Sequence, residues 1–162
     1  MTKKLTQSWA LPAHQDRSRA QRDRLLRAAE RVFAQKGFWE AHVTDIAAAA
    51  DASVGSFYRR FKDKEALFFA LQAYMHERAH DNIRRFFDEA ERLQLPLPEV
   101  FTRLMANTIR SVTGIAGYYR ALYEMSLRGR EVWPRMRELE AYQAGRIADL
   151  ALGRGVASSR AW

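Results

Sequence analysis

The chain has 162 residues, of which 48% are hydrophobic and 28% charged, a mixture typical of a folded globular protein. Cysteine is absent, so disulfide bonds and thiolate metal sites are excluded. No apolar run approaches the roughly 20 residues that span a bilayer, and the first residues lack an apolar signal core. We therefore expect a cytoplasmic protein that makes no contact with membranes.

Positive charge is concentrated near the N-terminus. The formal net charge is +8, and residues 1–61 hold 11 Lys and Arg against 6 Asp and Glu. The remaining residues hold 16 against 13. This asymmetry suits a polyanionic partner, although a positive face is also common on proteins where it only meets water.

The first helix is expected after an irregular start. Residues 1–17 show no hydrophobic period, and we expect a flexible basic arm there. Ser18 and Gln21 have the spacing of a capping box, which predicts a helix from about Arg19. Gly37 is placed to end this helix. The apolar positions at helical spacing between them are Leu25, Ala29, Val32 and Phe33.

Residues 44–61 have the pattern of a helix-turn-helix. Thr44 opens a helix of small residues, TDIAAAA, the letters DAS form a break, and Ser53 opens a second short helix, VGSFYRRF. Small side chains allow the second helix to cross the first closely. The second helix then presents a mixed face of glycine, serine, tyrosine and arginine, as in helices that enter the DNA major groove.

The candidate DNA contacts lie at the starts of both helices and along the second. They are Thr44, Ser53, Val54, Gly55, Ser56, Tyr58, Arg59 and Arg60. A hydroxyl at Thr44 or Ser53 can cap its helix, where the free N–H groups face phosphate. The first turn, residues 54–56, is best placed for base edges. Tyr58 can donate to a phosphate, and the two arginines offer phosphate contacts or a bidentate grip on guanine.

The remaining sequence predicts only further helices. Asp63 can cap a long helix that continues to Leu93, and the prolines of LPLP at 95–98 end it. Three more helices are expected over residues 101–112, 118–127 and 132–147. No segment alternates like a strand, so the predicted fold class is all-α, with about seven helices.

These helices suggest two domains. The DNA-binding domain is expected over residues 18–66, with its motif at 44–61. A helical ligand-binding or dimerisation domain is expected over 67–152. The last residues, 153–162, contain two glycines and no hydrophobic period, and we expect an unstructured tail.

The motif resembles the DNA-binding domain of TetR-family transcriptional regulators over about 50 residues. The first helix ends in VFAQKGF, which fits the family pattern LF-x-x-x-G-[YF]. The matching positions that follow are Thr44, Ile46, Ala47, Ala50, Ser53, Gly55, Ser56, Phe57, Tyr58, Phe61, Lys64, Glu65 and Leu67. Of these, Ile46, Ala47, Phe57 and Phe61 are expected in the core.

The resemblance implies a homodimeric repressor that binds a double-stranded DNA operator and is released by a small-molecule effector. It adds Lys64 to the candidate DNA contacts, because this residue matches the family's backbone-contacting lysine. No cofactor and no enzymatic activity are implied. Side chains that could line an effector pocket, or equally belong to the core, are Phe86, Phe87, Phe101, Met105, Tyr119, Tyr123 and Trp133.

Two positions depart from the family pattern. Asp51 stands where the glycine of the turn is usual, and Ala52 stands where valine is usual. Aspartate is among the few residues that accept a left-handed backbone, so the turn can form at some cost. Because Ala52 also offers less apolar volume, we expect a functional but slightly less stable motif.

A second motif indicates a different chemistry. His76, Glu77 and His80 form HExxH, and Glu99 follows with 18 residues between. On a helix, such histidines bind zinc and the glutamate acts as general base in zinc aminopeptidases. However, both histidines lie opposite the first apolar stripe of their helix, and no strand is predicted to align a peptide. We interpret the pair as solvent-facing and expect no metal site.

The length of the chain leaves alternatives open. Family members generally continue with two more helices that form the dimer interface, and this chain stops near where they begin. The dimer is then made differently, or the chain is truncated. A metal-dependent hydrolase and a helical product with only an interaction role therefore stay beside the DNA-binding regulator as hypotheses.

Overall fold

The computed structural model describes residues 10–154, and the side chains of residues 18–154. All regular structure in this part is helical, which confirms the all-α class. The helices are α1 (Ala10–Glu40), α2 (Val43–Ala49), α3 (Val54–Tyr58), α4 (Lys64–Arg92), α5 (Leu97–Gly114), α6 (Ala116–Leu127) and α7 (Pro134–Gly153). In the described part of the chain, no helix is both long and apolar enough to cross a bilayer.

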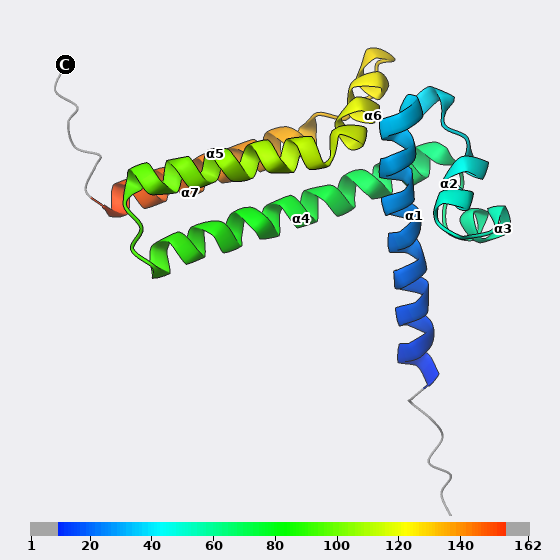
Figure 1. Ribbon diagram of the computed structural model, residues 1–162, viewed down its shortest axis with the longest axis horizontal. Helices are drawn as coiled ribbons and strands as arrows, with labels where there is room; N and C mark the ends of the chain where they lie inside the picture. The colour runs from blue at the N-terminus through cyan, green and yellow to red at the C-terminus, as the bar shows by residue number, and fades with distance from the viewer. Residues whose placement is uncertain (1–9, 155–162) are drawn as a thin grey trace, which may run out of the picture.

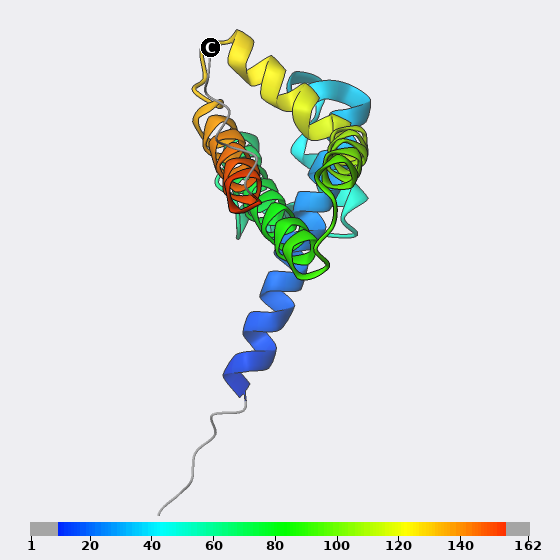
Figure 2. The ribbon, with the colours of Figure 1, turned by 90° about the vertical axis from the view of Figure 1, so that its left-hand side faces the viewer.

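The helices form two groups that meet where α1 crosses α4 (Figure 1). α2 and α3 lie on one side of α1, and α6 packs against the upper part of α1. α4, α5 and α7 extend away from this crossing as a long body, and an end-on view separates the three helices (Figure 2). The helix-turn-helix is thus at one end of the molecule.

The start of α1 differs from its prediction. The helix begins at Ala10, so residues 10–17 are not the flexible arm that we expected, and residues 1–9 lie outside the described part. Pro12 does not prevent an early start, because in a first turn its missing N–H has no partner within the helix. The predicted capping box at Ser18 therefore falls inside α1.

Gly37 breaks α1 as predicted. Its backbone has φ 77°, in the left-handed region, and the chain continues past this kink to Glu40. A side chain here would be strained by the backbone conformation and would also displace the carboxylate of Glu124, which accepts hydrogen bonds from the segment that follows. The kink aims the following segment, residues 38–41, towards α2.

The other predicted helices are present, but α5 begins earlier and α7 ends later than expected. Asp63 caps α4, and its carboxylate accepts a hydrogen bond from the Ala66 N–H at 2.7 Å. α5 begins at Leu97, earlier than predicted, because Pro98 in a first turn is tolerated. Pro134 is the first residue of α7. α7 ends at Gly153, and residues 155–162 of the predicted tail lie outside the described part.

The main hydrophobic core joins the helix-turn-helix to the body. Its buried residues come from α1, α2, α3, the first half of α4 and α6, and include Phe33, Ile46, Phe57, Phe68 and Leu122. The predicted domain boundary at residue 66 falls within the first turn of α4. The helix-turn-helix therefore shares one core with the helices that follow it, and any movement of α4 or α6 acts on it directly.

Candidate nucleic-acid interface

The start of α2 is organised by a carboxylate. The Asp45 side chain accepts a hydrogen bond from the His42 N–H at 3.0 Å and forms an ion pair with Lys36 at 2.8 Å. Hydrogen bonding to Lys36, and then to the His42 N–H, holds the pKa of Asp45 below its usual value. His42, rather than Thr44, precedes the first helical residue. The prediction that Thr44 caps α2 was wrong, because Thr44 lies inside the first turn with its side chain exposed.

The turn between α2 and α3 has the predicted left-handed residue. Asp51 has φ 49°, and Ala52 is partly buried against the main core. Arg31 of α1 donates from Nη2 to the carbonyl of Ala49, 2.9 Å away, at the last residue of α2. The turn is therefore fixed both by its own backbone and by a contact from α1.

Serine side chains organise the first turn of α3. Ser53 caps the helix as predicted, and its hydroxyl accepts a hydrogen bond from the Ser56 N–H at 3.1 Å. Ser56 itself is buried, and its hydroxyl accepts a hydrogen bond from Arg59 at 2.5 Å. Ser56 thus positions Arg59 and does not present its own side chain at the surface. Arg60 is half-buried and donates to the carbonyl of Ser56 at 3.3 Å.

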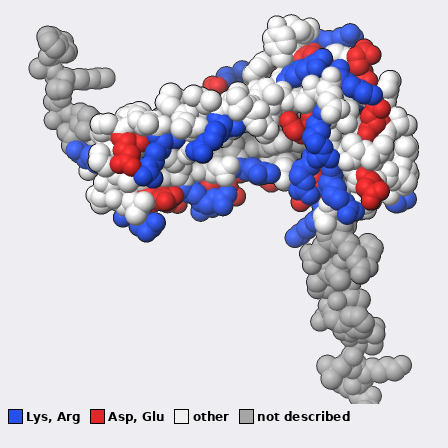
Figure 3. Space-filling model, in the orientation of Figure 1, with Lys and Arg blue, Asp and Glu red and all other residues white. Residues whose placement is uncertain are grey.

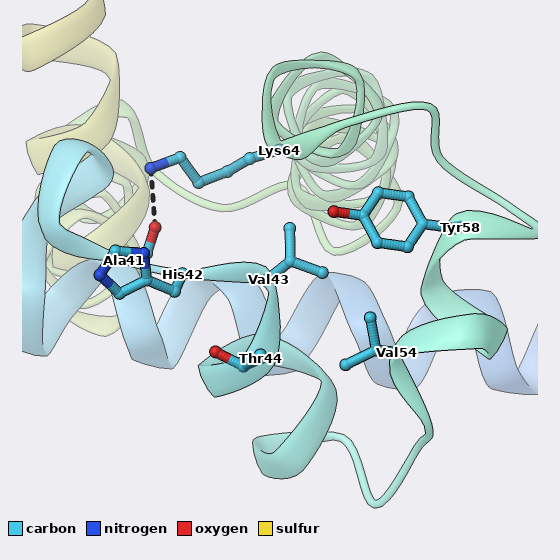
Figure 4. Close-up of a pocket in the computed structure, with 7 residues that line it drawn as sticks. All are labelled: Ala41, His42, Val43, Thr44, Val54, Tyr58 and Lys64. Atoms are coloured by element: carbon cyan, nitrogen blue, oxygen red, sulfur yellow. Dashed lines mark hydrogen bonds between the residues drawn. The ribbon is translucent and has the colours of Figure 1, made fainter.

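An open hollow of about 390 Å³ lies between α2 and α3 (Figure 4). Thr44 and Val54 line it from the two helices, and the hydroxyl of Tyr58 points across it. Tyr58 has an exposed fraction of 56% and Val54 one of 38%. Gly55 and Arg59 are exposed beside them. These five residues form the surface that α2 and α3 offer to a ligand, and we call it the reading surface.

Lys64 also lines this hollow, but its amine is bound within the protein. Nζ donates to the carbonyls of Phe38 at 2.6 Å, Trp39 at 3.1 Å and Ala41 at 2.7 Å. Burial lowers the pKa of Lys64. These hydrogen bonds give Lys64 a structural role that does not involve DNA, because they hold the segment after the kink against α4. A contact of Lys64 with the DNA backbone stays a prediction.

A second charged residue holds the same segment from the opposite side, and the sequence did not reveal it. Glu124 of α6 accepts hydrogen bonds from the N–H groups of Phe38 at 2.6 Å and Trp39 at 3.4 Å. Arg120 pairs with Glu124 at 3.1 Å. Residues 38–41 are thus held by α4 and α6 together, and the contacts with Glu124 join residues more than 80 positions apart.

Close packing of α1 and α6 depends on Gly117, which was also missed. A Cβ atom on Gly117 would overlap the backbone of Glu30 and Ala34 in α1. The only signal in the sequence was a glycine directly before the helix predicted over residues 118–127. Instead, Gly117 lies in the first turn of α6 and lets that helix approach α1.

The HExxH motif does not gather a metal site. His76 lies 3.7 Å from the carboxylate of Glu138 in α7, and His80 stacks on the ring of Tyr142 at 3.9 Å. The prediction of a solvent-facing pair was wrong, because α7 covers this side of α4. Glu77 is exposed on another side. Within residues described by the structure, no group of three or more metal-ligating side chains comes together.

A larger cavity of about 920 Å³ lies in the body, lined by residues of α1, α4, α5, α6 and α7. Of the aromatic and methionine residues singled out in the sequence, Phe86 and Tyr119 line it. Phe87 is buried in the smaller core of the body. The exposed members of that group are Phe101, Met105, Tyr123 and Trp133.

The part of the chain that contains the reading surface is similar to known DNA-binding proteins. Residues 25–71 match the family model described as bacterial regulatory proteins, tetR family. The chain is 40% identical over 57 residues to the HTH-type transcriptional repressor Rv1474c of Mycobacterium tuberculosis. It is 42% identical over 57 residues to the uncharacterized HTH-type transcriptional regulator YdgC of Bacillus subtilis. Each match covers 35% of this chain, and 30% and 29% of those proteins.

Solved structures extend the similarity to the body. A TetR-family transcriptional regulator from Mesorhizobium loti matches 86% of this chain and 71% of its own, with a TM-score of 0.72 and 19% identity. A TetR transcriptional regulator from Streptomyces coelicolor matches 83% of this chain and 73% of its own, with a TM-score of 0.59 and 28% identity. The order and packing of the helices are therefore those of such regulators.

Proposed function

We propose that the chain is a DNA-binding transcriptional regulator of the TetR type, and that it is a repressor released from its operator by a small-molecule effector. The observation that carries the proposal is the reading surface, where side chains of α2 and α3 stand exposed around an open hollow. The similarity to a protein named as a repressor supports the negative direction of regulation.

The reading surface supports a division of roles among the predicted DNA contacts. We assign base-edge contacts to Val54 and Gly55, which are exposed in the first turn of α3. We assign phosphate contacts to Thr44 and Tyr58, which line the hollow, and to Arg59, which is exposed beside them. Ser53, Ser56, Arg60 and Lys64 act by holding α3 and the segment before α2 in place.

Positive charge on α1 also supports DNA as the partner. Figure 3 shows Lys and Arg side chains gathered over α1 where it enters the body. Such charge adds sequence-independent attraction to the phosphate backbone, and this attraction weakens as salt rises. We also propose a homodimer, because two reading surfaces one DNA turn apart would bind a near-palindromic operator.

The proposal is tested by selecting bound duplexes from random DNA with the purified chain. Fluorescence anisotropy then compares the enriched duplex with a scrambled one at several salt concentrations. We expect specific binding to be at least about 10³-fold tighter. Equal affinity for both duplexes would contradict a sequence-specific regulator. Sedimentation of the chain alone tests the dimer, and a monomer at micromolar concentration would rule it out.

A pair of tyrosine variants locates the DNA-binding surface. Tyr58→Phe removes one hydroxyl from the reading surface, and we expect DNA affinity to fall about tenfold through loss of a phosphate hydrogen bond. Tyr123→Phe removes an equally exposed hydroxyl from α6 and should leave affinity unchanged. Equal effects of the two variants would place the contact elsewhere.

A further inference from the structure

The body cavity has the size and walls of a small-molecule site. Its volume of about 920 Å³ falls within the range of ligand pockets in proteins. Apolar side chains from four helices form much of the wall, among them Met75, Ile83, Leu104, Ile115 and Leu139. Burial of an apolar group against them would supply binding free energy at the usual rate per unit area.

The charged residues of the cavity are mostly arginines. Five line it, Arg27, Arg31, Arg78, Arg85 and Arg110, against two glutamates, Glu30 and Glu89. An arginine keeps its charge at any physiological pH and binds carboxylate in a bidentate geometry. A cation in this cavity would be repelled by the excess of positive charge, whereas an anion would be attracted.

These arginines are not engaged in ion pairs with the carboxylates that the structure describes. Among the side chains that the structure describes, none of the five forms an ion pair with a carboxylate. Their hydrogen bonds go to neutral oxygens instead, for example from Arg78 to the Tyr74 hydroxyl at 2.9 Å and from Arg110 to the Asn107 amide at 2.5 Å. By contrast, Arg84, which lies outside the cavity on the same helix as Arg78, pairs with Asp81 at 3.2 Å.

We propose that this cavity binds a small organic anion with an apolar body, whose negative group pairs with these arginines. The proposal rests on the proposed function only in naming this anion as the effector. Arg31 connects the two sites, because it lines the cavity and also donates to the carbonyl of Ala49 at the end of α2. An anion that draws Arg31 into the cavity takes this bond away from the helix-turn-helix.

Calorimetry on the full chain tests the charge, with three probes of one chain length: octanoate, octanamide and octylamine. We expect octanoate to bind, octanamide to bind at least tenfold more weakly, and octylamine not to bind. Butyrate should bind more weakly than octanoate, by about fourfold for each methylene removed and no longer buried. Equal affinity for the three head groups would overturn the proposal, and so would no binding by any probe.

Charge-neutralising variants assign the binding to the cavity. Arg78→Gln should weaken octanoate about fivefold or more and leave octanamide unchanged, whereas Arg84→Gln should change neither. Thermal melting checks that both variants fold, and Arg110→Gln replaces Arg78→Gln if the latter does not. Equal octanoate binding by the arginine variants and the wild-type chain would overturn the assignment.

DNA binding by the same preparation separates the two proposals. If the chain binds its selected duplex but no octanoate, this inference fails and the repressor stands. If octanoate binds with the expected head-group preference but no duplex is ever selected, the ligand class stands and the repressor fails. Release of the duplex by octanoate, and not by octanamide at the same concentration, would support both.

Discussion

Twenty buried residues form one core where α1, α4 and α6 meet, whereas five form the core at the far end of α4, α5 and α7. The first core fixes the direction in which the helix-turn-helix points. Along α5, large apolar side chains stand exposed, including Met105 at 55% and Ile109 at 63%. Buried apolar residues are thus concentrated beside the reading surface, and the body beyond it has a smaller core.

The largest expected difference between the two ends concerns glycine. Gly117→Ala should destabilise the fold by about 3 kcal/mol, because the new Cβ overlaps the backbone of α1 and forces the helices apart. The same change at Gly145 in α7 meets no atom within 4 Å and should stabilise the helix by about 0.5–1 kcal/mol. Urea denaturation measures both, and equal effects would mean that the first core is no tighter than the rest.

The next comparison is between Lys64 and Arg154, two positively charged side chains that bind backbone carbonyls at opposite ends of the molecule. Lys64→Met leaves three carbonyls before α2 without a donor and should cost about 2 kcal/mol. Arg154→Met removes donors to the carbonyls of Leu95 and Ala90. It should cost less than about 1 kcal/mol, since Leu95 is only half-buried and water can replace the guanidinium. Denaturation midpoints of the two variants measure these costs. A larger loss of stability in Arg154→Met than in Lys64→Met would contradict the expected order.

Alkaline pH should weaken the first core selectively through Tyr118. Burial raises its pKa to about 12, while a tyrosine in the unfolded chain titrates near 10. The unfolded chain therefore loses this proton first, and the stabilisation present below pH 10 disappears as pH rises towards 12. The loss should reach about 1 kcal/mol by pH 11. Tyr118→Phe removes the titrating hydroxyl and should abolish this pH-dependent loss of stability. Parallel stability curves for wild type and variant from pH 8 to 11 would contradict the assignment of the loss to Tyr118.

The smallest effects are expected at two left-handed residues, one at each end. Asp51 in the turn has φ 49°, and Gln94 after α4 has φ 51°. Replacement by glycine should stabilise each site by about 0.5–1 kcal/mol, with Gln94 at the upper end because aspartate accepts this backbone better. Thermal melting of both variants measures the difference. A loss of stability at Asp51 would show that its side chain contributes more than its backbone costs.

The elements around the reading surface were predictable because their causes are local. Ser53 and Asp63 each bond to an N–H three residues later, and Asp51 lies in a short turn that demands a left-handed residue. Such relations are contained in a few consecutive letters. The start of α1 was missed because no residue between Ala10 and Ser18 prevents a helix, and a plausible cap inside the helix was given too much weight.

The partners of the reading surface were not predictable, because they come from distant helices. No pattern near Phe38 indicates that Glu124 accepts its N–H. Lys64 was predicted as a DNA contact from the family resemblance, which does not reveal that its amine binds the carbonyls of residues 38–41. The two histidines of HExxH were misplaced for a related reason. A helix that packs on different neighbours along its length buries different faces, and α7 covers the face opposite the first apolar stripe of α4.

The two charged residues that bind the backbone of residues 38–41, Lys64 and Glu124, have a consequence for protein engineering. Lys64 donates hydrogen bonds to the carbonyls of this segment, and Glu124 accepts hydrogen bonds from its N–H groups. The backbone of the segment is therefore bound through both kinds of polar group, as in the middle strand of a sheet. A chimaera that carries only residues 18–61 onto another helical body would lose both charged residues. Transplanting the specificity of this molecule therefore requires the lysine and the glutamate of the receiving body to stand where Lys64 and Glu124 stand here.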